Sequence, residues 1–109
     1  VSIIVKDVVE ILDNASGLKI LTLVEDALRA GEEVTVSFEG VSYVSTSFVN
    51  SAFIHLLENF IFNTIKAKLS FIKSTIQINK LIKERFVFES LHPAFGTSLY
   101  LFIAKTLSR

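Results

Sequence analysis

The sequence contains no cysteine, one proline and four glycines, and its longest uninterrupted apolar run is the six residues 99–104. Without cysteine, neither a disulfide nor a thiolate metal site can form, which suits a reducing cytoplasm. The apolar run is far shorter than the roughly 20 residues that a membrane-spanning helix needs. The apolar start of the chain is interrupted by Lys6, Asp7 and Glu10, unlike a signal peptide. We therefore expect a cytoplasmic domain without membrane insertion.

Hydrophobic residues make up 50% of the 109-residue chain and include ten phenylalanines, which is enough for one core in one domain. The chain has 11 basic and 11 acidic side chains. Acidic residues prevail in 1–65 and basic residues in 66–109. The basic side chains are dispersed rather than clustered, whereas binding to phosphates needs a contiguous basic patch. We expect no nucleic-acid partner.

Stretches that favour strands and helices alternate along the chain, as judged by β-branched content and by the three-to-four spacing of apolar residues. In order, we expect a strand over 2–12, a turn at 13–17, a helix over 18–30, a strand over 33–38, a helix from 47 to about 61, a strand over 67–73 and a helix from about 75. This alternation predicts an α/β domain with a mixed or largely parallel central sheet of about four strands, with helices packed on it.

The sequence pattern defines the ends of the domain less clearly than its centre. We interpret 1–109 as a single domain whose core spans about 3–91. The sequence does not fix where the helix that begins near 75 ends, because 86–88 (FVF) fits either a helix or an extended segment. The apolar segment 94–109 has no clear period, so the sequence leaves its structure open, with a helix over 98–108 as one interpretation.

Three hydroxyl side chains, Ser45, Thr46 and Ser47, lie where the strand 33–38 leads into the next helix. Functional sites of parallel sheets collect at such points, beyond the carboxyl ends of the strands. A nucleophilic serine, however, needs a general base within hydrogen-bond reach. His55 is eight residues beyond Ser47, hence about 12 Å away along one helix, and nothing brings His92 close. We expect no catalytic residue.

No motif for a cofactor or a metal accompanies the hydroxyl cluster. The glycines are scattered, so they form neither a P-loop nor a dinucleotide-binding fingerprint, and there is no paired-histidine spacing. Two roles remain open for the hydroxyls. One of them can cap the helix by accepting a hydrogen bond from a first-turn N–H. Alternatively, a phosphoryl group there would meet free N–H donors and the positive end of the helix dipole.

The residues around this cluster resemble a known family. The unit VTVSFEGVSYVSTSFVNSAFIHLL (34–57), with Gly31 before it and KLSFIKST (68–75) after it, resembles a STAS-like domain. These bacterial domains of unknown function are related to anti-sigma-factor antagonists. The resemblance spans roughly 3–91, and its hallmark is a hydrophobic strand followed by Phe38, Gly40-Val41 and Ser45-Thr46-Ser47-Phe48.

In the anti-sigma-factor antagonists, this loop reads Asp-Ser-Ser-Gly, and a partner ATPase kinase phosphorylates its first serine. The corresponding residues here are Ser45, Thr46, Ser47 and Phe48, so the aspartate is absent and a ring replaces the glycine. The resemblance implies a non-catalytic regulatory module that docks on a partner protein, with a histidine-kinase-like ATPase as the implied partner. It also makes Thr46 and Ser47 the candidate phospho-acceptors.

We expect the partner contact to lie in the loop 45–48 and the first turns of the following helix. The residues concerned are Ser45, Thr46, Ser47, Phe48, Asn50 and Ser51. Two positions of Phe48 remain open. Its ring either is partly exposed beside small polar residues, which suits a contact surface, or is tucked under the neighbouring strand.

Two further expectations concern binding. As an alternative to a protein partner, the same loop can serve a sensor of a small ligand, an anion or a nucleotide, as in the STAS domains of anion transporters. The apolar C-terminal segment also favours a homodimer. In either case we expect no resident cofactor and no metal ion.

Overall fold

Three parallel strands form the sheet of the computed structural model, which describes residues 1–91. β1 (Ser2–Ile4), β2 (Val34–Ser37) and β3 (Leu69–Ile72) are paired in the order β1-β2-β3. The predicted α/β class with a largely parallel sheet is confirmed. The expected count of about four strands is not met within residues 1–91, where the sheet has three. The segment 94–109 lies outside the described residues.

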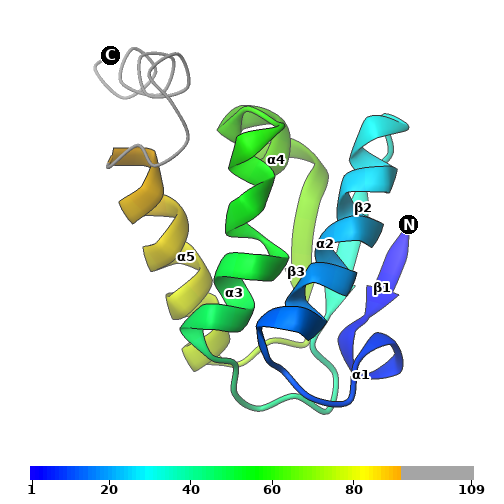
Figure 1. Ribbon diagram of the computed structural model, residues 1–109, viewed down its shortest axis with the longest axis vertical. Helices are drawn as coiled ribbons and strands as arrows, with labels where there is room; N and C mark the ends of the chain where they lie inside the picture. The colour runs from blue at the N-terminus through cyan, green and yellow to red at the C-terminus, as the bar shows by residue number, and fades with distance from the viewer. Residues whose placement is uncertain (92–109) are drawn as a thin grey trace.

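The helices that follow the strands gather on one face of the sheet (Figure 1). These are α2 (Asn14–Arg29), α3 (Thr46–Ala52), the 3-10 helix η1 (Ile54–Glu58) and α5 (Ile76–Leu91). A single helical turn, α1 (Val5–Val8), follows β1, and α4 (Phe62–Lys68) leads into β3. None of the helices within the described residues combines the length and the apolar character that crossing a membrane requires.

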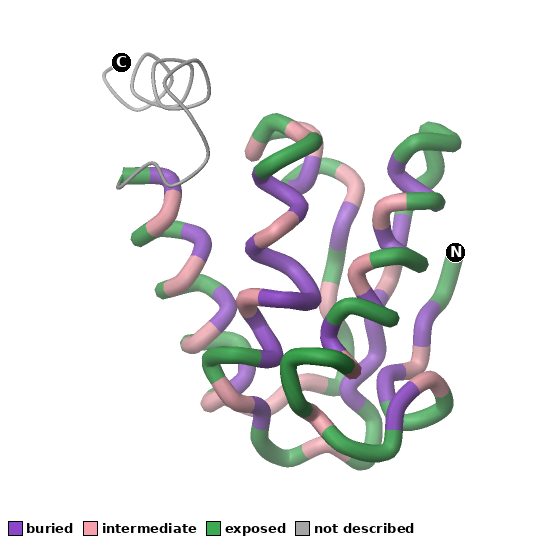
Figure 2. Tube along the Cα trace, viewed as in Figure 1, coloured by how far each residue is buried: buried purple, intermediate pink, exposed green. Residues whose placement is uncertain are grey.

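The two faces of the sheet differ in chemistry. Because side chains alternate along a strand, Ile3, Val36 and Leu69 share the face that is buried under the helices. Figure 2 shows that buried residues occur in the strands and in the helices that pack on them. The opposite face carries Ser2, Ile4, Thr35, Ser37, Ser70 and Ile72. Parallel sheets are usually covered on both faces, yet no helix of the described residues covers this one. Ser2 and Ser70 on this face are exposed, Thr35 is half-buried with its hydroxyl 3.3 Å from that of Ser70, and Ser37 is buried, so most of this face is open to water.

Four phenylalanine rings join the helical layer to the sheet. The ring of Phe53 lies 5.0 Å from Phe71, 6.2 Å from Phe38 and 6.3 Å from Phe48, between ring centroids. All three contacts of Phe53 are edge-to-face, the arrangement that aromatic quadrupoles favour. Phe38, Phe48 and Phe53 are completely buried. This cluster is the centre of the core.

A glycine permits the close packing of α2 against α3. Gly17 lies in the second turn of α2 and is buried. A Cβ atom at this position would lie 2.0 Å from Ser51 Oγ and 3.0 Å from the carbonyl oxygen of Phe48. The Ser51 hydroxyl also donates to the carbonyls of Ser47 and Phe48, at 3.0 and 3.2 Å, so rotating it away would break both hydrogen bonds. The two helices therefore fit together only with glycine at this position.

The prediction of a strand over 2–12 is wrong beyond Ile4. β1 pairs with only three residues of β2, and β2 ends at the turn around Gly40 (φ 75°), so a longer β1 would have no partner. The chain instead forms the turn α1, in which the N–H of Val9 donates to the carbonyl of Val5 at 3.0 Å. Both of these valines are buried while Asp7 between them is exposed, a pattern that fits a helical turn better than strand alternation.

The predicted helix from 47 to 61 is also corrected. The α-helix ends at Ala52, and the chain continues as η1, with φ −127° and ψ −41° at Phe53 between them. The change in backbone accompanies insertion of the Phe53 ring among its three aromatic neighbours. The strand expected over 67–73 is shorter, because residues 62–68 form α4.

The helix expected over 18–30 begins earlier, at Asn14, so most of the turn expected at 13–17 belongs to α2, whereas its end at Arg29 agrees closely with the expectation. Asp13 caps α2 by accepting from the N–H of Ser16 at 2.8 Å. After the helix, Gly31 adopts the left-handed conformation (φ 76°) that is typical of a helix end. The sequence left undecided whether residues 86–88 are helical or extended. They are helical, because α5 continues through them to Leu91 and buries Phe86 and Ser90, four residues apart.

We predict that Gly17→Ala destabilises the fold by about 1–3 kcal/mol, the usual cost of overpacking a core. The new methyl group would collide with Ser51 Oγ and with the Phe48 carbonyl. Chemical denaturation of the single variants and of Gly17→Ala/Ser51→Gly measures the effect. The double variant should recover part of the loss, since it removes the nearest atom. Additive losses in the two single variants would contradict this contact.

Candidate functional site

The loops that follow the three strands meet at one end of the domain, the lower end in Figure 1. They comprise residues 9–13 after β1 and α1, 38–45 after β2, and 73–75 after β3. Because all three strands are parallel, this end is the carboxyl edge of the sheet. Parallel α/β sheets place their functional sites at this edge, and the hydroxyl cluster predicted from the sequence lies here. We call this surface the carboxyl edge.

The central loop of the carboxyl edge, residues 38–45, is held by residues of the connection between β3 and α5 and of α5 itself. Thr75 Oγ1 donates to the carbonyl of Ser42 at 3.1 Å. Gln77 makes two hydrogen bonds with Val44, accepting from its N–H at 3.2 Å and donating to its carbonyl at 3.1 Å. Val44 is completely buried. The loop therefore has a defined position, fixed by residues more than 30 positions away in the chain.

Ser45 is the N-cap of α3, and a helix cap was one of the two roles left open for the hydroxyls. Its Oγ accepts from the N–H of Phe48 at 3.1 Å. The same hydroxyl donates to the carbonyl of Leu12 at 3.5 Å, which connects the loop to the segment before α2. One hydroxyl thus satisfies the cap and leaves the other two available.

Thr46 and Ser47 occupy the first two positions of α3, and both are exposed. Within residues 1–91, no hydrogen bond is recorded for either side-chain hydroxyl. A hydroxyl group that is exposed and makes no hydrogen bond within the fold is accessible to a partner or to a modifying enzyme. Neither process is tested by the structure.

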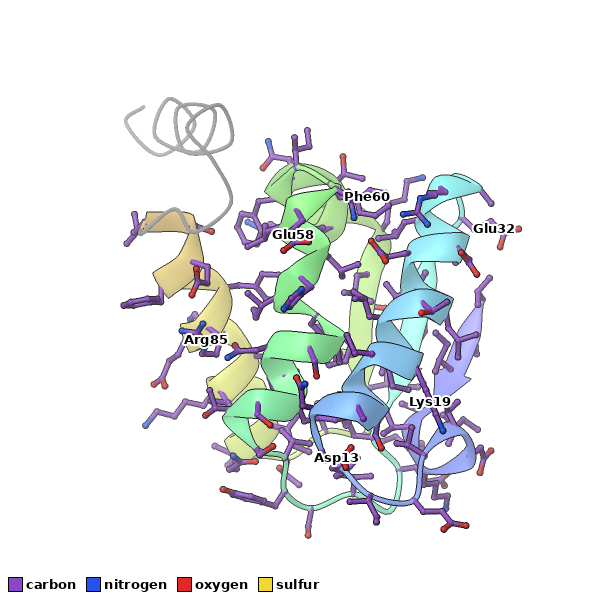
Figure 3. The ribbon with its side chains drawn as sticks, viewed as in Figure 1. Asp13, Lys19, Glu32, Glu58, Phe60 and Arg85 are labelled. Carbon is purple, nitrogen blue, oxygen red and sulfur yellow. The ribbon has the colours of Figure 1, made fainter. Side chains whose placement is uncertain are left out.

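The remaining expected contact residues do not lie on this surface. Phe48 is completely buried in the aromatic cluster, so the alternative in which its ring is tucked inward is correct. Ser51 is 1% exposed and packs against Gly17. Asn50 is partly buried, and its Oδ1 accepts from Arg85 Nε at 2.8 Å; Figure 3 shows Arg85 extending from α5 towards α3. The arginine also binds Glu89 at 2.6 Å.

Three apolar side chains at the carboxyl edge were missed by the sequence interpretation. Ile11, Tyr43 and Ile76 are 68%, 65% and 86% exposed, the highest values among the large hydrophobic residues of the described part. Ile11 and Tyr43 lie in the connections after β1 and β2, and Ile76 is the first residue of α5, directly after the connection that follows β3. Tyr43 and Ile76 are neighbours of the hydrogen-bonded pairs that join the central loop to α5. From the sequence, Ile11 was assigned to a strand and Ile76 to the start of a helix, so no local signal set these residues apart as exposed.

A shallow hollow of about 290 Å³ lies beside Tyr43. Its lining comes from the α1 region and from the central loop: Lys6, Val9, Glu10, Leu12, Gly40, Val41, Ser42 and Tyr43. The side chain of Lys6 lies against Gly40, where a Cβ atom would be 3.2 Å from Lys6 Cδ. The hollow has both a lysine and a glutamate in its lining, so it carries no net charge preference.

The charged and metal-ligating residues give no sign of a chemical centre among residues 1–91. His55 lies on η1, with its Nδ1 3.6 Å from Glu58 Oε1. His92 lies outside the described residues. No group of three or more histidine, aspartate or glutamate side chains in the described part could hold a metal ion.

A comparison of the chain with models of known protein families found a match. A model described as a STAS-like domain of unknown function matches residues 16–79, more than half of the chain. The chain belongs to this family. The match begins in the first turn of α2 and ends in the first turn of α5, so it includes the central loop and α3. The resemblance predicted from the sequence is confirmed. Comparisons with curated proteins and with solved structures found no match.

We predict that Ser45→Ala lowers the stability of the STAS-like domain by about 1 kcal/mol, the usual value of an N-cap. The change removes the acceptor for the Phe48 N–H and the donor to Leu12. Ser47→Ala is the matched control, because it makes the same substitution two residues away at an exposed position. Thermal denaturation should separate the two variants. Equal melting temperatures would contradict the cap.

Asp13 gives a second test, based on pH. The hydrogen bonds from Ser16 hold the pKa of this carboxyl below its ordinary value of 3.8. Its contribution to stability is therefore complete above 3.8 and is lost as the pH falls through the lowered pKa. Asp13→Asn retains an oxygen acceptor but cannot titrate. We expect the stability of wild type relative to Asp13→Asn to decrease in denaturation series taken from neutral pH to below 3.8; a constant difference would contradict this.

Proposed function

We propose that this STAS-like domain is a non-catalytic regulatory module that binds a partner protein through its carboxyl edge. The observation that carries the proposal is the exposure of Ile11, Tyr43 and Ile76 at the same end of the sheet. Exposed apolar side chains that gather on one surface are typical of interaction sites. Tyrosine in particular is enriched among the residues that contribute most to binding.

The hydroxyls of Thr46 and Ser47 supply a means of regulation in this proposal. They lie at the same end of the domain as the three apolar side chains and are exposed. A phosphoryl group on Thr46 would be tolerated by α3, since it would sit at the positive end of the helix dipole. It would also add about two negative charges to an apolar contact surface, which disfavours binding. The modification would thus release the partner without unfolding the domain.

The resemblance to anti-sigma-factor antagonists makes a histidine-kinase-like ATPase the first partner class to test. In that family, the loop at the start of the same helix is both contacted and phosphorylated. The replacement of aspartate by Ser45 and of glycine by Phe48 does not disturb the surface proposed here, because Ser45 serves as the cap and Phe48 points inward. Partner binding therefore depends on the exposed residues around these two positions.

We predict that affinity capture from native cell extract, read by mass spectrometry, recovers a partner with wild type and loses it with Tyr43→Ser/Ile76→Ser. Leu23→Ser is the control, since Leu23 is 42% exposed but belongs to the middle of α2. Thr46→Asp should lose the same partner and Thr46→Ala should retain it. Titration calorimetry with the purified partner then gives the change in affinity.

Two outcomes would contradict the proposal. If the edge variant and Leu23→Ser recover the partner equally, the contact lies elsewhere on the domain. If no partner is recovered, and ATP or phosphate raises the melting temperature of wild type, the domain is a ligand sensor. The reason is that a ligand of the native state alone stabilises it. The hollow beside Tyr43, with Lys6 in its lining, would be its site.

A further inference from the structure

An apolar groove lies on another part of the domain, between α4, β3 and α5. It has a volume of about 360 Å³ and is lined by Phe62, Ile65, Lys66, Leu69, Phe71, Lys83, Phe86 and Val87. Three of these are phenylalanines, and the rings of Phe62 and Phe86 are stacked with their centroids 5.8 Å apart. α5 packs mainly against α3 and η1, which leaves the groove between α5 and β3 unfilled.

The polar residues of the groove are two lysines. Lys66 and Lys83 are exposed, and neither forms an ion pair with a carboxylate of residues 1–91. Lysine side chains commonly lay their aliphatic stems along apolar surface and keep the ammonium group in water. The interior of the groove is therefore hydrophobic and its rim is hydrated, the arrangement expected where an apolar segment packs.

We propose that the apolar run 99–104 of the same chain occupies this groove. The run contains Leu99, Tyr100, Leu101, Phe102, Ile103 and Ala104, and no charged residue occurs between 93 and 104. This run lies outside the described residues, and seven residues separate it from the end of α5, the helix that forms one wall of the groove. An uncharged run of this composition matches the chemistry of the lining.

The connection between the groove and the run is long enough. Leu91, the last residue of α5, is one turn beyond Val87 on the same side of the helix, about 6 Å along the axis. Seven residues, 92–98, then precede Leu99, and they can span up to about 23 Å. A tethered segment is also present at a high effective concentration, on the order of millimolar, compared with any free occupant. The covalent connection therefore favours this run over a separate molecule.

The test is the fluorescence of the full chain carrying Phe102→Trp. The chain has no other tryptophan, so the emission reports on position 102 alone. We expect native emission at a shorter wavelength than emission in denaturant. Val87→Asp in the same chain should move the native emission to longer wavelength. Leu18→Asp is the matched control, because Leu18 on α2 is 44% exposed and Val87 is 47% exposed, and it should leave the emission unchanged.

Three results would overturn the inference. Native emission equal to emission in denaturant would place the run in water. Equal effects of Val87→Asp and Leu18→Asp would place it elsewhere on the protein. Emission that moves to shorter wavelength only as the protein concentration rises, with a dimeric mass by light scattering, would assign the groove to the run of a second copy. If circular dichroism shows that Val87→Asp does not fold, the near-isosteric Val87→Thr replaces it with the same expected direction.

Discussion

The position of α3 depends on the absence of a side chain at residue 17. With glycine there, the backbone of α2 approaches the Phe48 carbonyl and the Ser51 hydroxyl closely enough to exclude even a methyl group. That approach fixes the start of α3, and with it the cap at Ser45 and the direction of the Phe48 ring. The carboxyl edge is thus built on helix packing in the core, although its own residues lie in loops.

The same dependence explains why the central loop can present apolar side chains to water. Its backbone groups at Ser42 and Val44 are bonded to Thr75 and Gln77, and Ser45 is bonded to the segment before α2. A loop held on both sides has little freedom to bury Tyr43 by collapsing. The conformational entropy of the loop is lost on folding and not on binding, so a partner that contacts Tyr43 would meet a surface that is already ordered.

Local signals in the sequence account for the helix termini. Asp13, Gly31 and Ser45 each act within a few residues, so their roles as cap or stop were predictable from position and residue type. The length of β1 was not, because it is set by the short β2 strand more than 30 residues away. The end of α3 at Ala52 likewise follows from rings contributed by β3 and by the loop after β2, which no local pattern contains.

The candidate site was predictable only in part for the same reason. The hydroxyl cluster was visible as a run of three residues, and a helix cap was one of the two roles left open for it; the structure shows that Ser45 fills this role. The inward position of Phe48 could not be chosen from the sequence, because a residue at the first turn of a helix can face either way. Ile11, Tyr43 and Ile76 are more than 30 residues apart in the chain, and only the parallel order of the strands brings their loops to one end.

The open hydroxyl face of the sheet has a thermodynamic consequence. Exposure of apolar surface on unfolding raises the heat capacity, whereas exposure of polar surface lowers it. A sheet whose outer face carries Ser2, Thr35 and Ser70 already leaves that polar surface in water, and only its inner face gains apolar contacts. The hydroxyls of this face that are already in water add no lowering term when the protein unfolds, so the heat capacity change comes mainly from the apolar surface of the inner face and the helices. The curvature of stability against temperature is therefore set by the covered face of the sheet, since the heat capacity change is what curves that profile.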